Sequence, residues 1–240
     1  MSKASTAGVS KRAVSKASVS RRASKAAPSD EPARPVLRRP TRAELDAAHN
    51  TQVPDVIGPG LKVLFCGINP SLYSAAVGHH FARPGNRFWP AMHLAGFTPR
   101  LFVPGEDRSL LTLGYGVSNV VSRATATAEE LAPEEYVVGG KQLVRKVKTY
   151  GPACVAFLGI GAYRQAFGER DAHVGEQARK VGGARVWVLP NPSGLNAHYQ
   201  VADLARVYGE LRRAVEASPP APLHVRGEGS AATARKPRAG

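Results

Sequence analysis

Two short segments, roughly 120 residues apart, have similar sequences, and each contains an apolar run that ends in a polar turn. The first is LKVLFCGINPS at 61–71, and the second is VWVLPNPSGLN at 186–196. Runs rich in Val, Leu, Phe and Trp that end in Gly, Pro, Asn and Ser predict buried strands leading into tight turns. Because ligands of open α/β sheets bind beyond the carboxyl ends of the strands, we expect both polar loops to reach one crevice.

The rest of this region alternates between expected strands and expected helices. We expect strands at 61–68, 116–121, 153–158 and 184–189. We expect a long polar loop up to residue 86, and helices at 87–96, 108–113, 133–150, 161–167 and 199–215. Such alternation predicts a three-layer αβα fold with a central, mainly parallel sheet covered on both faces.

Charge divides the chain into three parts. Residues 1–50 hold 11 of the Lys and Arg residues against 4 acids, and the first 29 residues hold seven basic residues and no acid. Because this stretch has almost no large apolar side chain, burial cannot offset its ordering entropy, and we expect a disordered basic tail with room for a short helix near 42–49. Residues 218–240 predict a second disordered basic tail, and 51–217 predict one globular domain.

The basic N-terminal stretch has three open interpretations: a passive solvated tail, a phosphate-binding arm that strengthens DNA binding, or an acid-poor transit peptide. It lacks the apolar core of a secretory signal, and no run of 18 apolar residues is present for a membrane span. We therefore expect a cytoplasmic, nucleoid-associated protein with no membrane partner. Cys66 and Cys154 lie in apolar runs and predict buried free thiols, and no Cys/His spacing suggests a metal or other cofactor.

Four ordered sequence matches carry a family resemblance. They are Gly-Ile-Asn-Pro at 67–70, Gly-His-His-Phe at 78–81, Pro-Gly-Asn-Arg-Phe-Trp at 84–89 and Asn-Pro-Ser-Gly-Leu at 191–195. Over about residues 61–215 the chain resembles the mismatch-specific uracil-DNA glycosylases and the related thymine-DNA glycosylases. The resemblance implies a uracil-DNA glycosylase-like fold and a monomer that acts without a cofactor on double-stranded DNA containing G·U mismatches.

The resemblance assigns catalysis to Asn69. An amide cannot act as a general base, but it can orient a water toward the sugar C1′ and hydrogen-bond the base. The alternative is that Asn69 only shapes the turn before Pro70. An Asp at this position would add a charge beside the sugar cation, so an Asn predicts a slow enzyme.

The base pocket implied by the resemblance contains Ile68, Ser74, Phe81 and Asn191. An extruded base needs an aromatic platform, and Phe81 lies in a polar stretch that is poorly suited to a core position. The backbone N–H groups of Ile68 and Phe81 would read the uracil oxygens. Ser74 would lie near C5 and hinder a thymine methyl, which favours uracil by the modest margin that one methyl supplies.

The second loop resembles the family's DNA wedge. Leu195 would fill the gap left by the flipped nucleotide, while Gly194 and Asn196 would contact the opposite strand. Relatives often carry Ser and Arg after this leucine, whereas this chain has Asn196 and Ala197, which weakens the case for a basic contact there. An ordinary surface leucine is the alternative.

A few further side chains are candidates for phosphate contacts. They are Ser71, where relatives commonly have Gly, together with Ser193, His79 and Arg123. His80 and Asn119 receive no definite role. No lysine occupies the expected loops, so no Schiff-base lyase step is expected.

The sequence thus predicts a monofunctional DNA glycosylase that flips uracil, and also ethenocytosine, out of G-mispaired duplex DNA and leaves an abasic site. Two alternatives remain open: a non-catalytic DNA damage or mismatch-binding module of the same fold, and an α/β enzyme acting on free nucleosides. The net charge of +15 and the wedge-like Leu195 weigh against the second.

Overall fold

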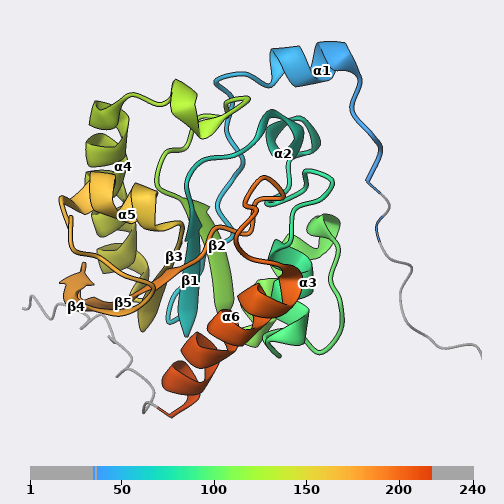
Figure 1. The fold of residues 1–240 in the computed structure, drawn as a ribbon. Helices are drawn as coiled ribbons and strands as arrows, with labels where there is room; N and C mark the ends of the chain where they lie inside the picture. Colours follow the sequence, from blue (N-terminus) through green and yellow to red (C-terminus); the bar gives the residue numbers. More distant parts are fainter. Residues whose placement is uncertain (1–34, 36, 218–240) are drawn as a thin grey trace, which may run out of the picture. The chain divides into compact units, whose positions relative to one another are not determined.

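The computed structural model describes residues 35 and 37–217. Its centre is a five-stranded sheet with the spatial order β2-β1-β3-β5-β4 (Figure 1). The strands are β1 (Val63–Gly67), β2 (Tyr115–Asn119), β3 (Cys154–Leu158), β4 (Gly175–Val181) and β5 (Ala184–Leu189). The pairs β1–β2, β1–β3 and β3–β5 are parallel, and only the edge strand β4 runs antiparallel, against β5.

Six α-helices and two 3₁₀ helices are found among the described residues. The α-helices are α1 (Arg42–Ala47), α2 (Leu72–Val77), α3 (Phe88–Leu94), α4 (Pro133–Tyr150), α5 (Ile160–Phe167) and α6 (Val201–Glu216). The 3₁₀ helices are η1 (Pro104–Leu113) and η2 (Ala128–Glu130).

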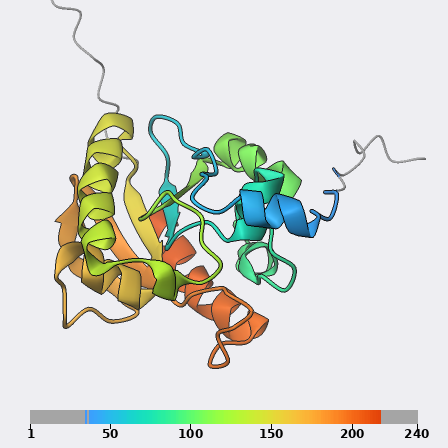
Figure 2. The ribbon, with the colours of Figure 1, turned by 90° about the horizontal axis from the view of Figure 1, so that it is seen from above.

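Alternate residues of each central strand enter two separate cores. Val63 and Phe65 of β1 pack into the core that α3 and α6 cover. Leu64 and Cys66 of the same strand face the opposite core, which α4 and α5 cover. Figure 2 shows helices on both sides of the sheet, and the predicted three-layer αβα fold is confirmed. Side chains of successive strand residues point to opposite faces, so a strand buried on both sides is apolar at most of its positions.

The short 3₁₀ helix η2 is not predicted from the sequence, η1 begins at Pro104 rather than at 108, and two further elements differ from the expectation. The segment 72–77, expected to belong to a polar loop, forms α2, which begins at the N-cap Ser71 and ends at Gly78 in the left-handed region with φ 76°. Strand β4 was not expected, because most of its side chains are half-buried or exposed and the sequence carries no apolar run there. Its pairing with β5, rather than its own sequence pattern, makes it a strand.

The described structure begins before residue 51, the boundary that composition predicts for the domain. The expected short helix is α1, whose N-terminus carries a capping box between Thr41 and Glu44. Ala48 is buried, and the Asn50 N–H donates to the Ala124 carbonyl. The rest of the two expected tails, residues 1–34 and 218–240, lies outside the described residues. Within the described residues no helix is both long and apolar enough to cross a membrane.

Candidate functional site

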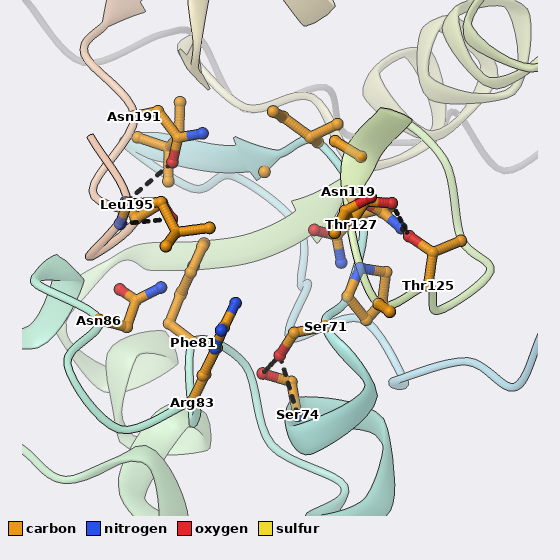
Figure 3. Close-up of a pocket in the computed structure, with 18 of the residues that line it drawn as sticks. Ser71, Ser74, Phe81, Arg83, Asn86, Asn119, Thr125, Thr127, Asn191 and Leu195 are labelled. Carbon is orange, nitrogen blue, oxygen red and sulfur yellow. Dashed lines mark hydrogen bonds between the residues drawn. The ribbon is translucent and has the colours of Figure 1, made fainter. Parts of the chain in front are cut away.

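A cavity of about 380 Å³ opens beyond the carboxyl ends of β1, β2 and β5 (Figure 3). The loop after β1 contributes Asn69, the loop between α2 and α3 contributes Phe81, and the loop after β5 contributes Asn191 and Leu195. The two similar sequence segments therefore line one cavity, as the strand pattern predicts. Its volume falls within the range of roughly 300–1,000 Å³ that is typical of small-molecule sites.

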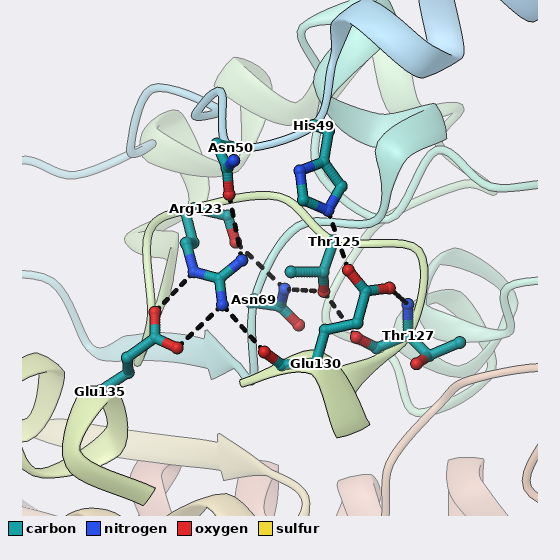
Figure 4. A network of polar contacts seen from close by, with 8 residues as sticks. All are labelled: His49, Asn50, Asn69, Arg123, Thr125, Thr127, Glu130 and Glu135. Carbon is teal, nitrogen blue, oxygen red and sulfur yellow. Dashed lines mark hydrogen bonds and ion pairs between the residues drawn. The ribbon is translucent and has the colours of Figure 1, made fainter. Parts of the chain in front are cut away.

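The side chain of Asn69 is held by two hydrogen bonds from its amide nitrogen. This nitrogen donates to the Arg123 carbonyl at 3.1 Å and to the Thr125 hydroxyl at 2.6 Å (Figure 4). The Thr125 hydroxyl in turn donates to the Thr127 carbonyl at 2.7 Å. Both amide protons are used in these bonds, so the amide oxygen is the group of Asn69 left to accept a hydrogen bond in the cavity.

Arg123, whose carbonyl accepts from Asn69, is itself held by several partners of its guanidinium. Its guanidinium forms an ion pair with Glu135 at 2.5 Å and donates to the Asn50 side chain and the Glu130 carbonyl. The Arg123 guanidinium lowers the pKa of the Glu135 carboxyl to about 2. Arg123 was expected to contact phosphate, whereas the structure commits its guanidinium to these internal partners and its carbonyl to Asn69.

Phe81 has two different ring faces. It stacks on Phe88, with ring centroids 4.1 Å apart and an interplanar angle of 27°, and the half-buried ring also lines the cavity. Its φ of 54° is left-handed, which is uncommon for a bulky residue and turns the chain sharply at this point. The ring thus belongs both to the core, through Phe88, and to the cavity wall.

The wall beside Phe81 is fixed by two serines. Ser71 caps α2, and its hydroxyl donates to the Ser74 hydroxyl at 3.1 Å. The buried Ser74 oxygen also accepts the Ala82 N–H at 3.0 Å, which ties α2 to the Phe81 turn. The N–H groups of Ile68 and Phe81 make no hydrogen bond with another described residue, so both remain available to a ligand.

The two loop histidines differ in exposure. His80 is 2% exposed, and its Nε2 lies 3.0 Å from the Pro54 carbonyl. Burial lowers the pKa of His80 and favours the neutral ring. His79 is more exposed, and its Nδ1 lies 3.2 Å from the Asp107 carboxylate. Because Asp107 also accepts the His80 N–H, it anchors this loop to η1.

The loop after β5 is shaped by its own side chains. Asn191 accepts the Ser193 N–H at 2.9 Å, and Asn196 donates to the Asn191 carbonyl at 3.0 Å. Asn191 and Asn196, expected to contact base and opposite strand, thus also build the turn. Ser193 accepts the Leu195 N–H, and Leu195 itself is 74% exposed at the rim of the cavity.

Further residues line the cavity beyond those given a role from the sequence. Arg83 is exposed and Asn86 half-buried on the Phe81 loop, and residues 125–129 form the facing wall. Asn119, left without a role, is 8% exposed at the end of β2 and lines the cavity. The signal for Asn119 was its place at a strand end, whereas Thr125 carries no pattern of its own.

The side chains of Asn119 and Phe81 both lie close to Gly67 at the end of β1. A Cβ on this residue would lie 2.6 Å from the Asn119 side-chain oxygen and 3.4 Å from the Phe81 ring. Such close approach requires glycine. The absent side chain therefore lets an amide and an aromatic ring meet at the end of β1.

Cys66 and Cys154 are buried free thiols, as expected, and burial raises the pKa of Cys154 to about 12. Among residues 35 and 37–217, no group of three His, Cys, Asp or Glu side chains is arranged to hold a metal ion.

Fold and cavity together define an α/β protein with a cavity at the carboxyl ends of its strands, lined by an aromatic ring and by the amide side chains of Asn69, Asn119 and Asn191. The family model of the uracil DNA glycosylase superfamily matches residues 54–212, and the chain belongs to this superfamily. Membership supports the role of a uracil glycosylase, an enzyme that hydrolyses a glycosidic bond and acts on DNA. The chain is also similar to a candidate uracil DNA glycosylase from Methanosarcina acetivorans, solved by NMR. The identity is 22% and the TM-score 0.43, over 68% of this chain and 98% of the other.

Proposed function

We propose that this protein is a monofunctional, mismatch-specific DNA glycosylase that acts as a monomer on uracil opposite guanine in duplex DNA. The observation that carries the proposal is the fixed amide of Asn69, whose nitrogen is committed to Arg123 and Thr125. Its oxygen then accepts a proton of one water and aims that water at the sugar C1′. The reaction adds the water OH to C1′ and returns the base with a proton, leaving an abasic site.

The remaining groups hold the base and replace it in the duplex. The outer face of Phe81 stacks on the extruded uracil, and the N–H groups of Ile68 and Phe81 bind its oxygens as negative charge develops there. The buried Ser74 hydroxyl faces the C5 edge and disfavours a thymine methyl. Exposed Leu195 enters the stack where the nucleotide has left.

Ethenocytosine is the second proposed substrate. The cavity of about 380 Å³ leaves room beyond a single pyrimidine ring. Hydrolysis also depends on how good a leaving group the base is, and no carboxylate takes the place of Asn69. Slow cleavage of poor leaving groups and faster cleavage of activated bases are therefore expected.

The test is a single-turnover cleavage assay with enzyme in excess over duplexes carrying G·U, A·U, G·T or G·ethenocytosine, and over single-stranded uracil DNA. We expect cleavage of G·U and G·ethenocytosine above A·U and G·T. Failure to cut G·U duplex would remove the enzymatic proposal. Equal cutting of A·U and G·U would remove the mismatch preference.

The variant Asn69→Ala separates the enzyme from a mismatch-binding module. We expect it to lose cleavage by at least about a hundredfold, the scale of a lost water-positioning group, and to keep its affinity for duplex DNA with an abasic site. The matched control is Gln142→Ala, which removes an amide from the exposed face of α4. Unchanged cleavage by Asn69→Ala would contradict the assigned role.

A further inference from the structure

Arg87 forms hydrogen bonds with four residues of the loop that carries Leu195. We call residues 190–199 the wedge loop. Arg87 lies directly before α3, yet its guanidinium donates to the Tyr199 carbonyl at 2.5 Å, to the Asn196 carbonyl at 2.7 Å and to the Ser193 carbonyl. Its backbone N–H donates to the Pro192 carbonyl at 2.9 Å. One residue therefore contacts the wedge loop at four points.

Apart from the bonds to Arg87, few hydrogen bonds join the wedge loop to the other described residues, although Tyr199 packs against the core. Its internal hydrogen bonds come mainly from the side chains of Asn191, Ser193 and Asn196, and it contains no helix or strand. At its start the buried Tyr208 hydroxyl donates to the Pro190 carbonyl at 3.2 Å. Without Arg87, three carbonyls spread over seven residues would lose their shared donor.

The two loops also touch through backbone alone. A Cβ on Gly194 would lie 2.8 Å from the Gly85 carbonyl oxygen, so the residue before Leu195 rests against the loop that carries Phe81. Among the described residues no carboxylate forms an ion pair with Arg87. Its charge is thus directed at the carbonyl oxygens, and charge-assisted hydrogen bonds of this kind are the strong ones.

We propose that Arg87 is a positioning residue that sets the wedge loop before DNA arrives, so that Leu195 is already held at the place of the flipped nucleotide. This inference rests on the proposed function for the role of Leu195, but not for the order of the loop. A loop ordered in advance loses less conformational entropy on binding, and the saved free energy is available for base flipping.

The first test needs no DNA. Hydrogen exchange is measured in the wedge loop of the free protein for Arg87→Met, which keeps an apolar stem, and Arg87→Lys, which keeps a charge with fewer donors. We expect exchange of the Asn196 and His198 amides to rise about tenfold in Arg87→Met, with a smaller rise in Arg87→Lys. Amides of β1 and β3 should not change.

The matched control is Arg164→Met. It removes another guanidinium that donates to a loop carbonyl, that of Ala172. Wedge-loop exchange should stay as in the unmodified protein. If Arg87→Met does not fold, Arg87→Lys decides the test. Unchanged wedge-loop exchange in a folded Arg87 variant would overturn the proposal.

The second test is a double-mutant cycle with Leu195→Ala in single-turnover cleavage of G·U duplex. If Arg87 acts through Leu195, each single variant lowers the rate by about tenfold and the double variant is no slower than the slower single one. Single-stranded uracil has no stack to fill, so each single variant should slow its cleavage by a smaller factor than it slows cleavage of G·U duplex. Losses that multiply, or an equal loss on single-stranded substrate, would overturn the positioning role. An unmodified protein that cuts neither substrate would refute the proposed function and leave the exchange result to decide on Arg87.

Discussion

The Asn69 side-chain nitrogen lies 2.6 Å from the Thr125 hydroxyl, and this bond joins two loops whose partners are 56 residues apart in the chain. The Thr125 hydroxyl has one proton, which it gives to the Thr127 carbonyl. Its oxygen can therefore only accept from Asn69, so the amide must present its nitrogen here and its oxygen elsewhere. The relay fixes which end of the amide meets a water.

Replacing Thr125 with Val removes this acceptor and leaves an amide proton of Asn69 without its partner. A lost hydrogen bond of this kind costs about 1–3 kcal/mol, and we expect the single-turnover rate on G·U duplex to fall about tenfold while DNA affinity is kept. Thr112→Val is the control, because its hydroxyl bonds the Ser109 carbonyl far from the cavity. A rate equal to that of the control would remove Thr125 from the relay.

Phe81 has both a packing and a binding function, and Phe81→Leu separates them. Leucine keeps an apolar side chain against Phe88 but has no aromatic face for a base. Base stacking is worth roughly 1–3 kcal/mol. Its loss should therefore raise the half-saturating enzyme concentration in single-turnover cleavage by about five- to 150-fold. Urea unfolding should show a much smaller change than for Phe81→Ala. Equal cleavage by the unmodified and Phe81→Leu proteins would mean that the ring is only core.

Gly67→Ala should impair the site without breaking the fold. The added methyl would meet the Asn119 side-chain oxygen at 2.6 Å, so the amide or the Phe81 ring must move out of its place in the cavity. We expect slower cleavage with a modest loss of stability. Gly161→Ala is the control. Gly161 lies in α5, and a Cβ at this position would meet no other atom within 4 Å. This variant should leave cleavage unchanged and stabilise the fold by about 0.5–1 kcal/mol.

The central sheet could be predicted because β1 and β3 carry no polar side chain and β5 carries only Arg185, as expected for strands buried on both faces. Edge strand β4 could not, since its sequence GEQARKV alternates no apolar side chains and only the neighbouring β5 pairs it. Helix α2 had readable signals in the cap residues Ser71 and Gly78. They lay inside a polar stretch that the sequence analysis assigned to a loop.

The candidate site was predictable where one residue sits beside a strand end, as Asn69 does. It was not predictable where the role depends on a contact across the fold. Thr125 reaches Asn69 only because β2 lies next to β1, and Arg87 reaches the wedge loop only because α3 begins beside it. Arg123 shows the same limit from the other side. Its charge predicts a phosphate contact, and the ion pair with Glu135, which only the fold brings about, could not be read from the sequence.

His80 should make stability depend on pH. Burial holds its pKa below the ordinary value of about 6.5, so the unfolded chain takes up a proton that the folded one resists. The stability is fully present above about pH 6.5 and is lost as the pH falls through the folded pKa. His80→Asn cannot take up this proton. Urea unfolding of both proteins at about pH 7.5 and 5.5 should show a smaller loss for the variant. Parallel losses would contradict the assignment.

The basic N-terminal segment can be tested by removing residues 2–34, which carry eight Lys and Arg residues and two acids. A cut at residue 50 would also remove α1, buried Ala48 and the Asn50 bond to Arg123, and so would confuse a charge effect with a damaged site. Each phosphate that the segment neutralises adds about 0.9 to the slope of log affinity against log salt. We expect a shallower slope for the truncated protein on G·U duplex, and the same reduction when the Lys and Arg residues of 3–25 are changed to Gln in the full chain. An unchanged slope would mean that the segment is a passive tail, because a phosphate-binding arm cannot lose its charge without releasing fewer ions.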